Sequence, residues 1–309
     1  MNDQKIKNIL KIIISSLIYY SGLFFLLNKT IKRNGLIVFI YHNFNTFTND
    51  YWENGELFET NYQKNFERQI KFIKEHIGFV QPESIAEQLE KNDLKALITF
   101  DDGYKDNFYI AFPILKKYNI PAIFIISTGF IDNNKLLWHD RIRQWGIENC
   151  YSKKKIKRIL KKLNADKINI PKYLENIDIK NKYVRSLMMN WNAIKEIATN
   201  GYIVGAHTQS HIPLNYLNEL DEFKEIRDSM NILKINLSQD VEFFAVPNGK
   251  YSANTQNILK ELHIRYCFSI IPGINDNRVN RYFLKRNAIL PSDPIPVVAL
   301  KILIIKLFK

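Results

Sequence analysis

The chain has 309 residues, of which 46% are hydrophobic, and it contains few glycines and prolines, so its composition excludes a disordered protein and suffices for one large domain. Its formal net charge of +13 favours an anionic partner such as a membrane lipid, a nucleic acid or an acidic polymer. No nucleic-acid recognition motif accompanies this charge, and we therefore expect no nucleic-acid partner. Cys150 and Cys267 lack a pairing pattern or metal-ligand spacing and fit free thiols in a reducing compartment.

Residues 1–34 combine several lysines with an uncharged, mostly apolar run from Ile12 to Leu27. The run is shorter than the ~20 residues of a spanning helix, and no small-residue cleavage site follows it as in a signal peptide. Basic residues on both sides suit a helix at a membrane interface, while packing on the domain is the alternative. We expect a membrane-associated or peripheral cytoplasmic-face protein, and the sequence leaves an anchored extracytoplasmic form open.

Apolar strand-like runs alternate with helical segments across residues 35–292. We expect strands at 36–41, 96–100, 121–126, 202–206, 241–246, 266–269 and 283–290, and helices at 65–77, 82–89, 108–118, 191–200, 221–237 and 255–262. This alternation predicts a parallel sheet or barrel in one domain. Residues 45–60 are expected to form a loop.

Two segments depart from the alternation. Residues 131–190 are rich in lysine and have weak strand signals, so we interpret them as a helical insertion in the same domain. The segment 293–309 is apolar with three lysines and predicts a basic amphipathic helix, which lies either on a membrane or on the domain.

Polar residues directly follow several of the predicted strands. These residues are His42, Asp101 and Asp102, Ser127 and Thr128, His207, and Pro247 and Asn248. In a β/α barrel the carboxyl ends of the strands form one rim, which carries the site. Independent strand ends therefore predict one polar site at that rim.

Asp101 and Asp102 end a buried strand at Gly103. Adjacent carboxylates cannot both ionise cheaply unless they share a cation or a proton. His207 and His211, four residues apart, can meet one ion if the backbone turns after the strand. Two imidazoles with one carboxylate suit a divalent metal that activates water, and the second carboxylate is then free to act as a base.

The pair Thr99–Gly103 and His207–His211 resembles the first two motifs of the polysaccharide deacetylases, the NodB-homology domain of carbohydrate esterase family 4. The resemblance covers about residues 36–290 and implies a distorted (β/α) barrel with about seven parallel strands. It implies that Asp101 is the general base and that Asp102, His207 and His211 bind zinc or a similar divalent metal.

The third motif departs from the commonest family pattern. Where the family often has Arg-Pro-Pro-Tyr-Gly, residues 244–249 read Phe-Ala-Val-Pro-Asn-Gly, similar to the exopolysaccharide-type branch. The Arg that positions the base is therefore missing there. Tyr41 with His42, and Arg286 in the last strand, also resemble that branch. Arg286 is either directed into the site or structural, and the late His of many relatives is not evident, because His263 is expected far from the rim.

The resemblance implies hydrolysis of N-acetyl groups on N-acetylhexosamine units of a polysaccharide or glycan, with a metal-bound water as the nucleophile. The leaving amine is protonated by His42 or by Asp101, and a backbone donor near Tyr104 holds the oxyanion. Expected substrate contacts are Tyr104, Trp138, Asp140, Pro247, Asn248 and Arg286. For Trp138, stacking on a sugar competes with anchoring of the insertion.

Two rival functions remain at this point. One is a deacylase or amidase that acts on a lipid-linked or nucleotide-linked sugar, which apolar termini would suit. The other is a catalytically inactive carbohydrate-binding relic, which the missing Arg and the missing late His would suit. The intact Asp101 argues against the relic, since metal binding alone would not need it.

Overall fold

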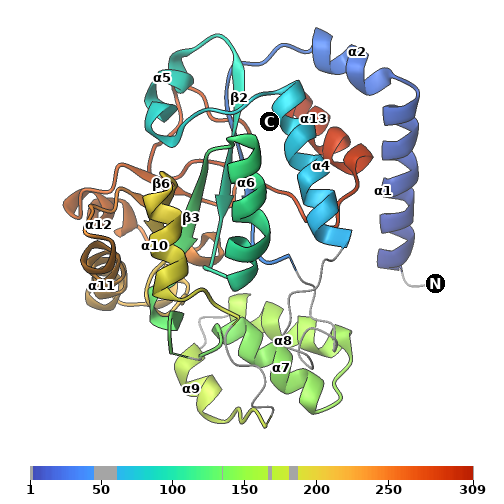
Figure 1. The fold of residues 1–309 in the computed structure, drawn as a ribbon. Coiled ribbons are helices and arrows are strands. Elements are labelled where there is room, and N and C mark those ends of the chain that lie inside the picture. Colours follow the sequence, from blue (N-terminus) through green and yellow to red (C-terminus); the bar gives the residue numbers. More distant parts are fainter. Residues whose placement is uncertain (1–2, 45–60, 134, 166–168, 181–186, 309) are drawn as a thin grey trace.

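The computed structural model describes residues 3–44, 61–133, 135–165, 169–180 and 187–308 (Figure 1). In this part of the chain seven parallel strands form one sheet in the order β6-β5-β4-β3-β2-β1-β7. Their bounds are β1 Gly35–Tyr41, β2 Leu94–Phe100, β3 Ala122–Ile126, β4 Ile203–Ala206, β5 Phe243–Ala245, β6 Tyr266–Phe268 and β7 Arg286–Ala288. A parallel bridge from Phe268 to Leu284 links the two edges, so the predicted (β/α) barrel is confirmed as a nearly closed one.

The strand register brings the predicted site residues to one rim. β1 pairs with β2 from Gly35 opposite Leu94 to Tyr41 opposite Phe100, so both strands end at the same level. The amide of Asp101 continues this pairing and donates to the Tyr41 carbonyl at 3.0 Å. The amide of His207 likewise donates to the Ile126 carbonyl of β3 at 2.9 Å. Because all strands run in parallel, these residues leave the sheet on the same side.

Alternation along the strands divides the apolar residues between two faces. Leu97 and Ile123 belong to a cluster on the inner face that the sheet encloses, whereas Ile98 and Phe100 belong to the larger cluster beneath the surrounding helices. Thr99 and Asp101 follow Leu97 at intervals of two residues and therefore face inwards. A buried polar column thus continues the apolar interior of the barrel up to the rim.

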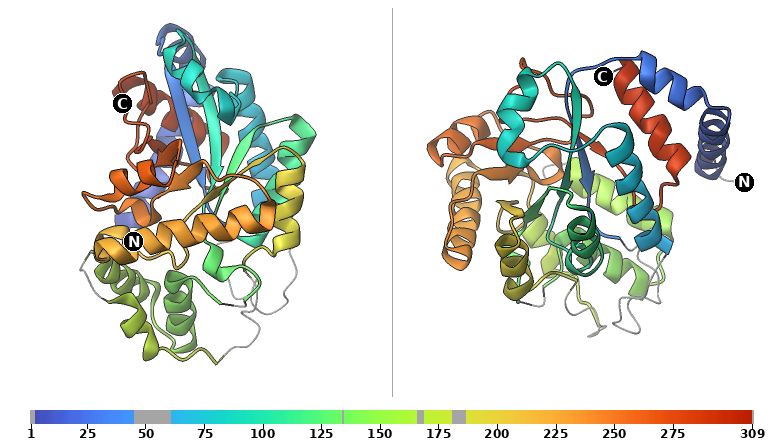
Figure 2. Two further views of the ribbon diagram at one scale, coloured as in Figure 1. Left: turned by 90° about the vertical axis from the view of Figure 1, so that its left-hand side faces the viewer. Right: turned by 45° about the horizontal axis from the view of Figure 1, so that its top comes forward.

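Helices cover the outside of the sheet (Figures 1 and 2). Around the barrel these are α4 Asn61–His76, α5 Ile85–Glu90, α6 Phe112–Tyr118, α10 Trp191–Thr199, α11 Glu219–Leu237 and α12 Thr255–Glu261, and a π-helical turn, η2 Asn107–Ala111, leads into α6. Single turns η1 Pro82–Ser84, η3 Thr128–Phe130, η5 Leu214–Tyr216 and η6 Pro247–Gly249 complete the loops. Asn190 and Asn218 cap α10 and α11 through their side-chain oxygens.

The described residues of the predicted insertion are helical. They form α7 Trp138–Glu148, α8 Lys153–Ala165 and α9 Ile170–Glu175, which lie together at one end of the barrel (Figure 1). The insertion has an apolar cluster of its own, made of Trp138, Ile142, Leu163, Ile170 and Ile177. The predicted loop at 45–60 lies outside the described residues.

The terminal segments pack side by side on one flank of the barrel. α1 Asp3–Tyr20 and α2 Leu23–Thr30 contact α13 Ile295–Phe308, which in turn contacts α4 (Figure 1). Among the described helices, none alone has the length and hydropathy to cross a membrane, and only the pair Ile9–Tyr20 and Leu23–Thr30, bent by 75°, meets that test jointly. The tail forms the helix α13 and packs on the domain, but the prediction that it is a basic amphipathic helix is wrong, because Ile304 and Leu307 are exposed while Lys306 is buried.

Candidate active site

Asp101 lies at the end of β2 and is paired with Arg286 of β7. The Arg286 guanidinium donates from Nη1 to Asp101 Oδ1 at 2.6 Å and from Nη2 to Oδ2 at 2.7 Å. It also donates to Thr99 Oγ1 at 3.1 Å and to the Ser269 carbonyl at 2.8 Å, so four directed hydrogen bonds fix its plane. Both charged groups are buried, so the ion pair is desolvated.

The Arg286 pair determines the charge state of Asp101. Burial raises the pKa of Asp101, but the adjacent Arg286 charge, followed by His207, outweighs burial and holds this pKa below its ordinary value. Asp101 is consequently a carboxylate with a fixed orientation. The arginine that the third motif lacks is thus supplied by the last strand, and Arg286 contacts Asp101 from inside the barrel instead of facing solvent as a substrate contact would.

Asp102, His207 and His211 come together beside Asp101. Asp102 Oδ1 lies 3.0 Å from His211 Nε2 and 3.5 Å from His207 Nε2, and potential ligand atoms of the three residues lie within 4.8 Å of one another. All three side chains are buried. His207 Nδ1 is 2.7 Å from the Ala245 carbonyl, to which it donates, so its Nε2, which faces Asp102, is the atom that would bind a metal.

The donor atoms of this triad fit a divalent metal. Asp102 Oδ1 is buried without a hydrogen-bond partner among the described residues, although such atoms are normally paired. One carboxylate oxygen with two imidazole nitrogens is a set that zinc and several other divalent ions accept. Burial raises the pKa of Asp102, but His211 and His207 outweigh it and lower this pKa well below normal, so the carboxylate is available as a ligand.

Strained backbone holds the triad in place. Asp102, Thr208 and His211 have positive φ angles of 76°, 62° and 56°, a region that non-glycine residues rarely adopt. The Thr208 hydroxyl accepts from the His211 amide at 3.0 Å, while Glu225 of α11 accepts from both amides between them. The hydrogen bonds from Thr208 and Glu225 therefore stabilise the turn between Thr208 and His211, whose positive φ angles are unfavourable for these residue types.

His42 follows β1 and has an exposed side chain at the same rim. The residue before it, Tyr41, is paired with Phe100, which directly precedes Asp101, so His42 and Asp101 leave neighbouring strands at the same level. The His42 carbonyl accepts from the Asn107 side chain at 2.7 Å, and this fixes the backbone at the end of β1. The position of His42 is compatible with donation of a proton to a departing group.

The insertion reaches the triad through α7. Trp138 Nε1 donates to the His211 carbonyl at 3.0 Å, and the indole is buried in the insertion core. The predicted sugar-stacking role therefore does not match its position, and its anchoring role does. Asp140 is also fully buried, and it accepts from Tyr104 at 2.9 Å and Arg143 at 2.7 Å.

Burial raises the pKa of Asp140 to about 6, although Arg143 and Tyr104 lower it. Tyr104 is buried as well, with its hydroxyl on Asp140 and on His139 Nε2 at 3.0 Å. The side chains of Tyr104 and Asp140 thus satisfy each other and support the wall of the site, so neither side chain is open to a substrate.

Pro247 and Asn248 lie at the end of β5 in the turn η6. Pro247 is buried, and Asn248 is half-buried with a left-handed φ of 53°. The Asn248 side-chain nitrogen has no hydrogen-bond partner among the described residues. This nitrogen is buried in the turn, so Asn248 has an unused donor but does not present it to solvent.

Two neighbours of the catalytic groups could not be assigned to their partners from the sequence. The imidazole of His139 contacts His211 with 5.3 Å between ring centroids, and Arg286 pairs with Asp101. His139 carried a signal, because it lies between Trp138 and Asp140, but its distance in sequence from His211 hid the contact. Arg286 was a candidate, but only the closure of the barrel reveals its partner.

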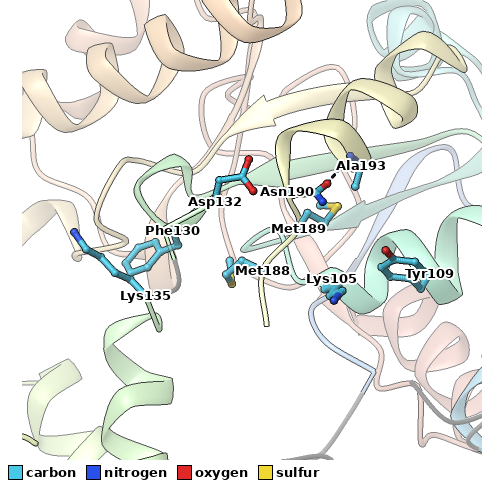
Figure 3. Close-up of a pocket in the computed structure, with 9 residues that line it drawn as sticks. All are labelled: Lys105, Tyr109, Phe130, Asp132, Lys135, Met188, Met189, Asn190 and Ala193. Atoms are coloured by element: carbon cyan, nitrogen blue, oxygen red, sulfur yellow. Dashed lines mark hydrogen bonds between the residues drawn. The ribbon is translucent and has the colours of Figure 1, made fainter. Parts of the chain in front are cut away.

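A pocket of about 290 Å³ lies near the site, where Tyr104 and Met188 form an isolated bridge (Figure 3). Its lining combines charged, amide, aromatic and thioether side chains from η2 and the turn before it, from the end of η3 and the loop after it, and from α10 and the segment before it. The lining residues are Lys105, Tyr109, Phe130, Asp132, Lys135, Met188, Met189, Asn190 and Ala193. None of Asp101, Asp102, His207 and His211 lines it. The pocket is thus a neighbouring surface and not the metal site itself.

Comparisons with known proteins agree with this geometry. A family model described as "Polysaccharide deacetylase" matches residues 88–267. YxkH of Bacillus subtilis (strain 168), which its name assigns to the polysaccharide deacetylases, is 22% identical over 236 residues, covering 74% of this chain and 66% of YxkH. The chain therefore spans just under two thirds of the length of that curated relative.

Solved structures with the same fold include PplD, IcaB and BpsB, of which the titles of PplD and BpsB name a deacetylase. Streptococcus pyogenes PplD in complex with acetate has a TM-score of 0.59 at 22% identity, covering 86% of this chain and 96% of PplD. IcaB from Ammonifex degensii has a TM-score of 0.60 at 20% identity, covering 87% and 98%. The BpsB deacetylase domain from Bordetella bronchiseptica has a TM-score of 0.53 at 15% identity, covering 84% and 96%. At these identities the likeness concerns the fold.

Proposed function

Because the chain belongs to the polysaccharide deacetylase family, we propose that it is a metal-dependent hydrolase that removes N-acetyl groups from N-acetylhexosamine units of a polysaccharide or glycan. One observation supports this most directly. A charged base, Asp101, lies beside a buried triad with an unpartnered carboxylate oxygen, and Asp101 Oδ2 is 3.8 Å from His207 Nε2. Base and metal ligands therefore face the same small space.

Asp102, His207 and His211 would hold the metal ion, for which zinc fits the donor set best. When bound, the ion supplies Lewis acidity, which lowers the pKa of a coordinated water and polarises an acetamide carbonyl. His207 is prepared for this role by its hydrogen bond to Ala245, and Asp102 by its low pKa.

Asp101 would act as the base. Arg286 keeps it ionised and orients both carboxylate oxygens, so that it accepts a proton from the attacking water without first reorganising. The leaving amine then needs a proton. Asp101 returns the proton it has taken, or His42 donates one from the end of the neighbouring strand β1; both residues lie at the same rim.

The neighbouring pocket favours an extended substrate over a single small sugar. Its aromatic rings, amide and charged groups are typical of sugar-binding surfaces, and it lies beside the segment that follows Asp102 (Figure 3). A polymer could place one acetamide at Asp101 while an adjacent sugar unit contacts this pocket. We therefore propose a polymeric glycan instead of a nucleotide-linked sugar as the substrate.

Acetate and free-amine release from N-acetylglucosamine oligomers of increasing length tests the proposal on the full chain. We expect activity that rises with oligomer length and falls at least ~10³-fold in Asp101→Asn, with metal content unchanged. Metal analysis should show loss of the ion in His207→Ala and retention in His263→Ala, which alters an exposed histidine beyond α12.

Several results would contradict the proposal. Wild-type protein that binds metal and glycan but releases no acetate would indicate a binding relic. Full activity in Asp101→Asn would show that Asp101 is not the base. Retained metal in His207→Ala would show that His207 is not a metal ligand. Preference for a lipid-linked or nucleotide-linked sugar over the oligomers would replace the proposed substrate class.

A further inference from the structure

The helix α1 presents its apolar side chains away from the protein. Its outer face consists of large hydrophobic residues at helical spacing, and the exposed fraction reaches 66% at Leu17 and 78% at Tyr20. The exposed large hydrophobic residues of α1 are Ile6, Ile9, Leu10, Ile12, Ile13, Ile14, Leu17 and Tyr20. A helix that faces water on this side would instead carry polar residues there.

The inner face of α1 combines polar and apolar residues. Ser15 is fully buried, and its hydroxyl can donate only to the Ile12 carbonyl of its own helix, at 2.9 Å. Lys11, which is half-buried, approaches Asp293 at 3.9 Å. Ile18 and Tyr19 also pack on this side, Tyr19 against Phe72 of α4, so part of the apolar surface of α1 is covered by the domain. Burial against the barrel does not explain the eight exposed hydrophobic residues of α1.

The apolar surface continues onto the neighbouring helix ends. Leu23, Phe25 and Leu26 of α2 are exposed, as are Leu307 and Phe308 at the end of α13. Only Phe24 of α2 is buried, against Phe72 of α4. In the described part of the chain, exposed large hydrophobic residues concentrate on these three helices. Such a contiguous patch indicates an interaction surface.

Positive charge surrounds this apolar surface. Residues 4–34 contain six basic residues and no acidic residue, and Lys7, Lys29, Lys32 and Arg33 are exposed in the structure. Lysines and arginines beside an apolar helix face are the pattern of helices that lie in the interface of an anionic bilayer. Two copies of this chain would instead bring like charges together.

We propose that the outer face of α1 and α2, with the end of α13, docks on a bilayer that contains anionic lipids. The two helices meet at 75°, and we place both of them in the interface plane, where their exposed apolar side chains would face the lipid. α1 stands on the flank opposite α11 and α12 (Figures 1 and 2). Docking there holds the barrel at the membrane surface and leaves α11 and α12 on its far side. This inference concerns location and does not depend on the proposed chemistry.

Co-flotation of the full-length chain with phosphatidylcholine vesicles, with and without 30% phosphatidylglycerol, tests the docking. We expect the protein to float with the anionic vesicles about 10-fold more strongly than with neutral ones. The variant Ile13→Glu/Leu17→Glu should lose at least ~10-fold of this binding, because it places two charges on the docking face.

The matched control is Leu220→Glu/Ile235→Glu, which makes the same changes at two exposed apolar positions of α11. It should float like the wild type, and both double variants should keep the wild-type thermal midpoint and metal content. Wild-type protein that fails to float with anionic vesicles, or flotation unchanged in Ile13→Glu/Leu17→Glu, would overturn the inference. So would a dimer that this variant dissociates, which would identify a second copy as the occupant.

Discussion

At the scale of single residues, the pair of Asp101 and Arg286 decides the chemistry of the site. Removal of both charges from water is costly, and the four hydrogen bonds of the guanidinium compensate for that cost only while both partners are present. The pair also replaces a positioning arginine that the third motif lacks. The role of positioning the base, which the third motif after β5 would supply, is taken here by Arg286 of β7, and the base itself is still Asp101.

We expect Arg286→Gln to destabilise the metal-free protein by about 3–5 kcal/mol at neutral pH, because it leaves the Asp101 charge buried and unpaired. Asp101→Asn should also destabilise the protein, because it leaves the Arg286 charge buried and unpaired. The double variant should be markedly more stable than the sum of the two losses predicts, as measured by denaturant unfolding. Strict additivity would show that the two side chains do not interact.

The same pair has a pH signature. The lowered pKa of Asp101 in the folded state contributes stability that is present above the ordinary aspartate pKa of about 4 and is lost as pH falls through the lowered value. The stability gap between the wild type and Arg286→Gln should therefore narrow as pH falls below about 4. If this stability difference stayed constant with pH, the destabilisation by Arg286→Gln would come from lost packing and not from the lost ion pair.

At the scale of elements, α7 connects the insertion to the metal ligands. Its first residue, Trp138, belongs to the insertion core and donates to the His211 carbonyl, and its second, His139, contacts the His211 ring. His211 has a left-handed φ of 56°, which costs free energy that this support offsets. The insertion is thus part of the site and not a separate appendage.

Trp138→Phe should keep the packing of α7 but remove the hydrogen bond to His211. We expect metal affinity to fall by about 10-fold, the lower end of the effect of residues that orient ligands, with stability reduced by only about 1 kcal/mol. Trp145→Phe on the same helix is the matched control and should bind metal normally. Metal affinity is measured by competition with a chelator. Equal affinity in the wild type, Trp138→Phe and Trp145→Phe would show that the Trp138 hydrogen bond does not orient the metal ligands.

At the scale of the whole molecule, α13 joins the terminal helices to the barrel. Lys306 is mostly buried and donates to the Asn28 carbonyl of α2 at 2.7 Å, while Arg33 donates to the Lys306 carbonyl at 2.6 Å. Burial lowers the pKa of Lys306. The last helix and the first two thus form one layer, and this layer sets how the exposed face of α1 is presented.

Lys306→Met should loosen this layer and leave the barrel intact. The loss of a charged hydrogen bond to Asn28 predicts hydrogen exchange in α2 that is faster by about 10-fold or more, while β1 and β2 keep their protection. Mass spectrometry of exchanged peptides distinguishes the two regions. A uniform acceleration in both would indicate global destabilisation, and unchanged exchange in α2 would show that Lys306 does not hold the layer.

The sequence by itself determined the alternation of strands and helices, and with it the β/α barrel, because residue periodicity depends on the local backbone. It also placed Asp101, Asp102, His207 and His211 at strand ends, where parallel pairing makes such residues converge on one rim. The parallel topology predicted that these residues lie close together. The four-residue spacing of His207 and His211 further predicted that both imidazoles can reach one ion. These residues could therefore be predicted without coordinates.

Only the tertiary structure decided the partners of these groups. Arg286 reaches Asp101 because β7, the last strand in the sequence, pairs with β1 next to β2, and this pairing is a long-range property that no local pattern encodes. Trp138 is buried and not open to a sugar because α7 folds back onto His211. The same holds for α1: its composition indicated an amphipathic helix, but which face points outward depends on its packing against α13.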